Sequence, residues 1–537
     1  MSQPLPMLAR QPVLARNAVA CSQPLAAQAG ARALMRGGNA IDAALAAAIC
    51  LTVVEPVMNG IGGDAFALVW DGQALHGLNA SGRAPAAWSP ERFAGLSAMP
   101  RLGWDSVTVP GGVSAWVALS ERFGALPFDQ LFDDAMRHAR EGFPVSPVIA
   151  RQWAQSVVDL AGQPGFEAFT LADDQGRPRA PRVGELWRLP DQADTLAEIA
   201  ATRGESFYRG RLAGAMVAWA AQHGGALALA DLEGHRPEWV QPIALPFAGH
   251  EVHEIPPNGQ GLAALMALGL LAHLPHAQTA PGSAARMHLE IEAMRLAFAD
   301  LHTHVGDPAH MRHTPAELLA PAYLKARAAL IDPARAGTHA PGAPPSGGTV
   351  YLCTADADGR MVSFIQSNYK GFGSGVVVPG TGIALHNRGI GFVTTPGHVN
   401  QVAGGKRPLH SIIPAFVTRG GQPVMAFGVM GGNMQAQGHV QMVLRHLLEG
   451  RNPQACSDAP RWRIDDAGQL ILEATVPTAV VDGLRELGHR PTVMPADSLD
   501  FGSAQLIARL PADQAGTALP VYAAGSDHRR DGLALGV

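Results

Sequence analysis

The sequence contains few cysteines, and they lie far apart. The four are Cys21, Cys50, Cys353 and Cys456, and no CxxC pair occurs. A disulfide framework requires a denser set of cysteines, and a structural zinc site requires clustered ligands. We therefore expect neither, and an apolar content of 47 % is sufficient for a large ordinary core.

Charged residues are also scarce, at 16 % of 537 residues, with a formal net charge of −5. This balance gives no reason to expect nucleic acid or an anionic membrane as a partner. The longest apolar run, residues 41–54, contains Asp42 and is shorter than the roughly 18 residues that a membrane span requires. The N-terminal residues contain no apolar run of the kind found in signal peptides. We expect a cytoplasmic protein.

Glycine and proline are abundant instead, with 61 and 42 residues spread through the chain. This distribution predicts many tight turns rather than disorder. Residues 23–37 and 39–54 are predicted helices, the first ended by Gly37-Gly38 and the second capped by Asn39. The alanine content of both segments indicates close helix packing.

A predicted amphipathic helix at 287–301 is followed by a segment, residues 330–348, that is poor in large apolar groups and rich in Pro, Gly and Ala. This composition predicts an exposed, flexible linker, where a cleavage site is plausible. Strands are predicted after it, with one helix near 434–449. The predicted strands are 349–355, 361–368, 374–378, 382–386, 412–418 and 423–429.

The dipeptide Gly348-Thr349 stands where the linker meets the first of these strands. A threonine becomes a strong nucleophile when it is an N-terminal residue, because its own α-amino group then acts as the base. We therefore predict that the chain cuts itself before Thr349. The hairpin that follows, with its turn at 357–359, places Thr349 opposite Ser367 to within one residue. A second hydroxyl at that point could orient the nucleophile.

Acyl transfer also requires backbone N–H groups that stabilise a developing oxyanion. Gly431 and Gly432, in the segment 427–439, stand between a predicted strand and a predicted helix. Glycine allows the backbone to approach a ligand closely, and a helix start adds positive potential. The alternative is that these glycines only form a turn.

Several long motifs in order resemble the γ-glutamyltranspeptidase family of N-terminal-nucleophile hydrolases over nearly the whole chain. They include LAAQAGARALMRGGNAIDAALAAAICLTVVEP, GIGGDAF, VPGG, PPNGQG, EAMRLAFAD, TVYLCTADADGRMVSF, FGSG, GKRPLHSIIPA and MGGN. The resemblance implies an α+β fold, a four-layer αββα sandwich. It also implies autocleavage into a large subunit, 1–348, and a small subunit, 349–537, that stay together. A dimer of this unit is left open, and no metal or organic cofactor is implied.

Position by position, the resemblance implies roles for the following residues. Thr349 matches the catalytic threonine, Ser367 the second hydroxyl residue, and Gly431 and Gly432 the oxyanion pair. Ser411 matches one of two adjacent serines that hold the substrate carboxylate, and His410 replaces the other.

The departures from the family pattern concern the substrate. The acidic residue that grips the α-ammonium of a γ-glutamyl group falls at Gly391, and a neighbouring glutamine is replaced by Arg388. A substrate-binding asparagine is replaced by Tyr369, whose ring could equally pack in the core. The carboxylate-binding arginine aligns near Ser81, and Arg83, two residues on, is a candidate substitute.

These departures predict a substrate that has a carboxylate but no amine, such as oxamate or a carboxyacyl amide. We therefore expect an amidohydrolase or acyltransferase that acts on a small amide, with water, an amine or a peptide as the acceptor. Two alternatives remain open. One is a true γ-glutamyltransferase or glutathione hydrolase, and the other is an uncleaved relative that only binds.

Three other signals are given their simpler interpretation. GFGSG at 371–375 does not match GxGxxG and predicts a turn, not a nucleotide site. The four histidines between 302 and 313 are expected in a solvated loop rather than around a metal. Asp64 in GIGGDAF could be catalytic, but a tight turn before a strand is the favoured interpretation.

Overall fold

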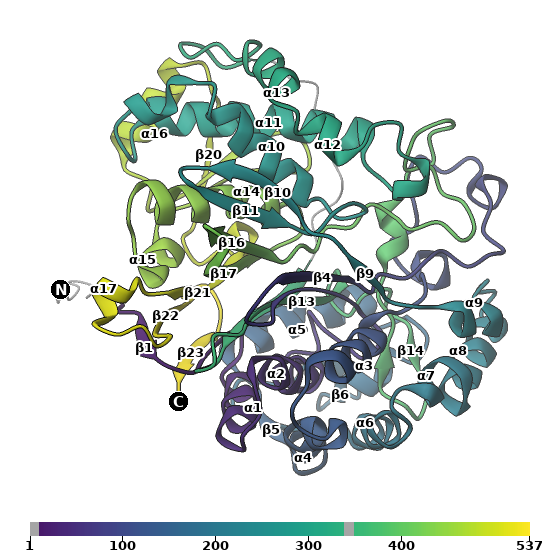
Figure 1. The fold of residues 1–537 in the computed structure, drawn as a ribbon. Helices are drawn as coiled ribbons and strands as arrows, with labels where there is room; N and C mark the ends of the chain where they lie inside the picture. The colour runs from purple at the N-terminus through teal and green to yellow at the C-terminus, as the bar shows by residue number, and fades with distance from the viewer. Residues whose placement is uncertain (1–9, 338–347) are drawn as a thin grey trace.

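The computed structural model describes residues 10–337 and 348–537, and these form two stacked seven-stranded sheets between two layers of helices (Figure 1). The predicted four-layer αββα sandwich is confirmed. The first and last strands of the described chain, β1 and β23, lie near each other at one side of the molecule (Figure 1).

Sheet A is antiparallel throughout, in the order β1-β22-β21-β17-β16-β11-β10. Its strands come from both ends and the middle of the chain. They are β1 (Val13–Ala15), β10 (Ile243–Phe247), β11 (His250–Glu254), β16 (Ala415–Arg419), β17 (Gln422–Met430), β21 (Ser503–Arg509) and β22 (Tyr522–Ser526).

Sheet B is also antiparallel, in the order β23-β2-β12-β13-β3-β4-β9. Its strands are β2 (Ala18–Cys21), β3 (Asp64–Trp70), β4 (Leu75–Asn79), β9 (Glu238–Val240), β12 (Gly348–Ala355), β13 (Met361–Tyr369) and β23 (Leu533–Gly536). The sheets face each other chiefly through β12 and β13 on one side and β17 on the other.

Helices cover the outer face of each sheet (Figure 1). Sheet B is covered by α1 (Pro24–Met35), α2 (Ala40–Val54) and α3 (Gly112–Phe123), with α4 (Asp133–Glu141) packed on α2. Sheet A is covered by α10 (Gly261–Leu271), α14 (Met434–Val443) and α15 (Pro453–Asp458), with α11 (Ala284–His304) and α13 (Pro321–Ala328) outside α10.

Residues 143–240 extend the helical layer beside sheet B, and a small three-stranded sheet lies beside sheet A. The first region contains α5 (Pro147–Leu160), α6 (Pro190–Thr202), α7 (Glu205–Arg209), α8 (Arg211–Gln222) and α9 (Leu229–Gly234). The small sheet contains β18 (Trp462–Ile464), β19 (Leu470–Glu473) and β20 (Thr492–Met494), with α16 (Thr478–Glu486) between the last two strands.

The helix starts and stops follow local chemistry. Asn39 caps α2 as predicted, and Asp42 completes a capping box by accepting from the Asn39 N–H. Gly37 follows α1 with φ +89°, a conformation that suits glycine. The predicted helix at 287–301 is present but longer, so His302 and His304 lie in the last turn of α11 rather than in a loop.

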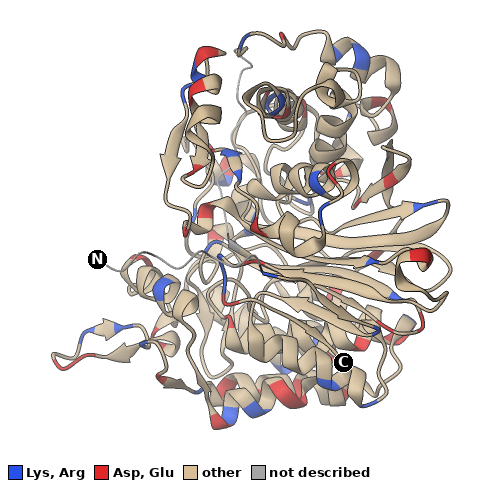
Figure 2. Cartoon of the chain, turned by 90° about the vertical axis from the view of Figure 1, so that its left-hand side faces the viewer, with Lys and Arg blue, Asp and Glu red and all other residues tan. Residues whose placement is uncertain are grey.

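Part of the predicted linker is held in place. The Ala336 N–H donates to the Leu487 carbonyl, and the Gly337 N–H donates to Glu292. Residues 338–347 lie outside the described residues. In Figure 2 the segments coloured as Lys, Arg, Asp or Glu lie mainly on outer helices and loops, and the stacked sheets carry few. None of the described helices has the length and apolar character that a bilayer span needs.

Candidate active site

Thr349 lies on the face of sheet B that is turned toward sheet A. Tyr351, two residues further along β12, has its hydroxyl 2.8 Å from Ser363 Oγ, and a Cβ on Gly428 of β17 would meet the Tyr351 ring at 2.4 Å. Side chains two residues apart on a strand share a face. Thr349 therefore points between the sheets, and its exposed fraction is 0 %.

The hairpin has the predicted register over most of its length. Val350 pairs with Gln366 and Ala355 with Met361, as the three-residue turn requires. A β-bulge between Gly348 and Val350 then pairs Gly348 with Tyr369. Thr349 consequently lies beside the Ser367–Tyr369 segment rather than in strict register with Ser367.

Gly431 and Gly432 connect β17 to α14, and both have positive φ, +119° and +61°. The Gly431 carbonyl accepts from the Met434 N–H, and the Gly432 carbonyl accepts from the N–H of Gln435, each at 3.1 Å. The N–H and C=O of one peptide point in opposite directions. The Gly432 N–H therefore points away from the helix, as an oxyanion donor must.

Gln435, in the first turn of α14, links the Gly431-Gly432 connection to Thr349 through a hydrogen bond. Its Nε2 donates to Thr349 Oγ1 at 3.0 Å, and both side chains are fully buried. Gln260 ties the same region to the loop of Ser411, because its Nε2 donates to the carbonyls of Ser411 and Gly432. The threonine, the glycine pair and Ser411 thus belong to one hydrogen-bonded assembly.

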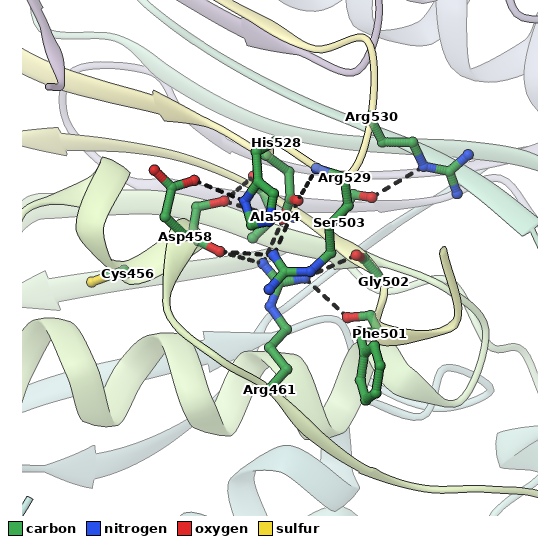
Figure 3. Close-up of polar contacts among 12 residues, drawn as sticks. Cys456, Asp458, Arg461, Phe501, Gly502, Ser503, Ala504, His528, Arg529 and Arg530 are labelled. Carbon is green, nitrogen blue, oxygen red and sulfur yellow. Dashed lines mark hydrogen bonds and ion pairs between the residues drawn. The ribbon is translucent and has the colours of Figure 1, made fainter. Parts of the chain in front are cut away.

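A buried ionic network around Arg461, shown in Figure 3, lies next to the glycine pair. The Arg461 Nη1 donates to the carbonyls of Phe501 and Gly502 at 2.9 Å, and its Nη2 binds Asp527. Gly502 in turn leaves no space beside Gly431, where a Cβ would lie 3.0 Å from the Gly502 Cα. The network therefore fixes the wall against which Gly431 packs.

Arg388 is the most unusual side chain of the site. It is 2 % exposed, donates from Nη1 to Ser411 Oγ at 2.8 Å, and lies 4.5 Å from the centroid of the Tyr369 ring. Its Nε and Nη2 atoms have no hydrogen-bond partner among the described residues. Burial lowers the pKa of Arg388 to about 10, opposed by the charge of Asp64, so the guanidinium stays protonated at neutral pH.

Asp64 is the main feature that sequence reasoning undervalued. It begins β3, pairs with Ser367 of β13, and is fully buried. Its carboxylate accepts from the Gly111 N–H at 2.9 Å and lies 3.1 Å from the Nε2 of His410. Burial raises the pKa of Asp64 to about 7, and the charge of Arg388 partly offsets this. A second histidine, His386, has Nε2 3.6 Å from the same carboxylate.

Two of the predicted substrate-binding residues, His410 and Arg83, form hydrogen bonds or ion pairs with other residues of the protein. His410 uses Nε2 toward Asp64 and Nδ1 as acceptor for the Ile412 N–H. Arg83 has a side chain 44 % exposed and forms ion pairs with Asp307 at 3.1 Å and Glu238 at 3.3 Å. The structure thus brings together Thr349, Ser367, Tyr369, Arg388, Ser411, Gly431 and Gly432, and directs Arg83 to a surface cluster.

The fold defines the class of protein, an N-terminal-nucleophile hydrolase. The family model of gamma-glutamyltranspeptidase matches residues 26–537. The chain therefore belongs to the gamma-glutamyltranspeptidase family, and it is an enzyme.

Similar proteins cover almost the whole chain. It is 34 % identical to the glutathione hydrolase-like YwrD proenzyme of Bacillus subtilis, over 96 % of this chain and 97 % of that protein. It is 37 % identical to the oxamate amidohydrolase proenzyme of Klebsiella pneumoniae, over 91 % and 93 %. The structure of a cephalosporin acylase from Bacillus halodurans is 46 % identical with a TM-score of 0.91, over 100 % of this chain and 99 % of that one.

Proposed function

We propose that this protein is a self-processing amidohydrolase whose nucleophile is Thr349, freed by cleavage of the Gly348–Thr349 bond. The buried position of Thr349 between the sheets, beside Ser367 and within hydrogen-bond distance of Gln435, supports this assignment. The names of two relatives, both proenzymes, also support it. Cleavage there leaves a large subunit, 1–348, and a small subunit, 349–537.

In the proposed reaction, Thr349 Oγ attacks the carbonyl carbon of the amide while its proton passes to the α-amino group of the same residue. That amine has an ordinary pKa of roughly 7.7–8.0, close to the working pH. The Gly431 and Gly432 N–H groups stabilise the oxyanion, and Ser367 orients the hydroxyl. The C–N bond then breaks, the leaving amine takes the proton, and water or an acceptor amine releases the acyl group from Oγ.

The proposed substrate is a small amide whose acyl group ends in a carboxylate. The observation that carries this is the pair of unpartnered N–H groups on buried Arg388, next to Ser411 and Tyr369. A buried guanidinium without partners is unfavourable, and a carboxylate accepts from two of its N–H groups at once. Ser411 and Tyr369 complete the proposed pocket, with His410 holding Ser411 in place through its contact with Asp64.

The position of the family's ammonium-binding acidic residue is occupied here by Gly391. A Cβ on Gly391 would lie 2.4 Å from the Leu409 carbonyl oxygen, so the backbone leaves no room there for the acidic side chain of the family pattern. The relative named for oxamate agrees with a substrate that has no α-amine. We therefore place oxamate-like and carboxyacyl amides ahead of glutathione.

Three p-nitroanilides test this proposal, because they differ by one group each. Glutaryl-p-nitroanilide has the carboxylate alone, the γ-glutamyl compound adds the α-amine, and the butyryl compound has neither. We expect kcat/KM to be highest for the glutaryl compound, with oxamate assayed beside it by ammonia release. A clear preference for the γ-glutamyl compound would instead support the glutathione-hydrolase alternative.

Processing is tested separately on the purified protein. A denaturing gel is expected to show two bands, and mass analysis is expected to find Thr349 at the N-terminus of the smaller one. Thr349→Ala should give a single band and no turnover. A single band from active wild-type protein would contradict the proposal and favour an uncleaved relative.

A further inference from the structure

Gln435 contacts the reacting oxygen, yet no part of the mechanism above assigns it a chemical role. It is the second residue of α14, directly after the Gly431-Gly432 connection, and none of its side chain is exposed. The Nε2–Oγ1 distance to Thr349 is 3.0 Å. No local sequence pattern predicts this contact, because the two residues are 86 positions apart.

The orientation of the Gln435 amide is fixed by its other hydrogen bond. Its Oε1 accepts from the backbone N–H of Ile413 at 3.0 Å. A backbone N–H can only donate, so the oxygen of the amide must face Ile413 and the NH2 group must face Thr349. Gln435 is therefore a donor to Thr349 Oγ1 and cannot be its base.

A donor at this place has two chemical consequences. Because Thr349 Oγ already accepts from Gln435, the single hydroxyl proton must point in another direction, where a base can take it. Negative charge also develops on Oγ when its proton leaves and again when the C–Oγ bond of the acyl-threonine breaks. A hydrogen bond to a charged group is stronger than one to a neutral group, so the Gln435 N–H is worth more in both transition states than at rest.

We propose that Gln435 is a catalytic residue, which stabilises the charge on Thr349 Oγ as the bond to the acyl carbon forms and breaks. The inference rests on the proposed function, since it takes Thr349 as the nucleophile. The same donor then serves self-cleavage, in which Oγ attacks the Gly348 carbonyl carbon. The Ile413 contact also ties it to the loop of Ser411, two residues away, so the donor is held rigidly between nucleophile and substrate pocket.

Gln437 provides a matched control on the same helix. It is also buried, and its amide accepts from the Ile464 N–H at Oε1 and donates from Nε2 to the carbonyls of Ile464 and Asn433. These hydrogen bonds go to β18 and to the start of α14, and none of them involves Thr349. Replacement by methionine removes two hydrogen bonds at Gln435 and three at Gln437, and only the Gln435 replacement removes a contact with the nucleophile.

The test compares Gln435→Met, Gln435→Glu and Gln437→Met in the full chain. Gln435→Glu keeps an acceptor for Ile413 and, when ionised, replaces the donor to Thr349 with a negatively charged acceptor. Each protein is assayed with glutaryl-p-nitroanilide, and the rate is divided by the amount of processed subunit on a denaturing gel. For both Gln435 variants we expect slower self-cleavage and a kcat lower by roughly 10- to 100-fold, with KM within about threefold.

Gln437→Met should lower the melting temperature about as much as Gln435→Met but keep kcat within about twofold. The inference is overturned if either Gln435 variant retains kcat within twofold, or if the Gln437 variant loses as much as they do. Failure of the proposed function would look different. Wild-type protein would then remain a single band, or Thr349→Ala would retain turnover, whatever Gln435 does.

Discussion

Arg388 is buried at a cost in folding stability, and we propose that it binds the carboxylate of the substrate. Burying a guanidinium with two unpartnered N–H groups is unfavourable, and the structure offsets this only in part, through the charge of Asp64 and the face of the Tyr369 ring. A bound carboxylate would remove the remaining penalty. In the proposed pocket, this single arginine would therefore contribute most of the affinity for the substrate carboxylate.

Replacing Arg388 tests that argument. Arg388→Met keeps most of the apolar volume and removes all donors, so glutaryl-p-nitroanilide should lose its main anchor. We expect its KM to rise by roughly two orders of magnitude, since hydrogen bonds to a charged group contribute about 1.5–3 kcal/mol. The butyryl compound, which has no carboxylate, serves as the control and should change by less than about threefold. Equal losses for both compounds would refute a carboxylate site.

A site residue could be predicted when the neighbouring sequence marks it, and could not be predicted when only contacts with distant segments do. Thr349, Gly431 and Gly432 stand at junctions that the sequence itself marks, between linker and strand or between strand and helix. Asp64 lies 346 positions from His410, and a tight turn was the favoured prediction for its segment, with a catalytic role as the alternative. The burial that raises its pKa arises from several distant segments, which no spacing rule could predict.

At the scale of elements, the hairpin could be predicted from local sequence, whereas the order of strands in the sheets depends on distant segments. The β12–β13 register follows from a turn of three residues and was predicted to within the bulge at Gly348. The order of the sheets was not predicted, because β22 and β23 near the C-terminus pair with β1 and β2 near the N-terminus. The predicted helix at 434–449 is not α-helical throughout, because Leu444–Leu448 form a π-helical turn.

The connection from β17 to α14 permits a test of backbone geometry. Gly431 has φ +119°, which an alanine adopts only with strain, and a Cβ would meet Gly502 and Met434. Gly431→Ala should therefore turn the peptide that presents the Gly432 N–H. We expect kcat to fall by roughly 100-fold, the effect of losing one oxyanion donor.

Gly450→Ala is the control for this change. Gly450 also has a positive φ, +65°, but open space surrounds its missing Cβ and it lies outside the proposed site. The substitution should lower the melting temperature with kcat nearly unchanged. If both variants keep full activity, the Gly431 connection does not form the oxyanion site.

In the whole molecule, the proposed subunits are interleaved rather than adjacent. In sheet B, β12 and β13 of the small subunit lie between β2 and β3 of the large one, and in sheet A β16 pairs with β11. Cleavage before Thr349 would break one bond of the chain and leave these ladders intact. Separation of the two fragments would require both sheets to unfold.

Buried histidines should set how the stability of the whole molecule depends on pH. Burial lowers the pKa of five of them from 6.5 to about 4 or about 3: His138, His302 and His489 to about 4, and His235 and His386 to about 3. Between pH 6.5 and about 4 the unfolded chain binds protons at these sites and the folded chain does not. Acidification through this window therefore favours unfolding.

Two buried carboxyls act in the opposite direction. Burial raises the pKa of Asp64 and Glu55 to about 7, so the folded state keeps their protons from about pH 7 down while the unfolded state binds them only near pH 4. The pKa values of Asp42 and Glu254 are also raised by burial, and those of His253, His304, His410 and His446 are also lowered by it. The histidines remain the larger group, so the unfolded state takes up more protons. We expect the melting temperature, measured by circular dichroism at constant ionic strength, to fall from pH 7 to pH 5.

His138→Gln should flatten that fall, because it removes one of the five groups without touching Thr349 or Arg388. The slope of the unfolding free energy against pH should differ between variant and wild type by the contribution of one proton, about 1.4 kcal/mol per pH unit within the window. A melting temperature that rises from pH 7 to pH 5 would mean that the carboxyls dominate.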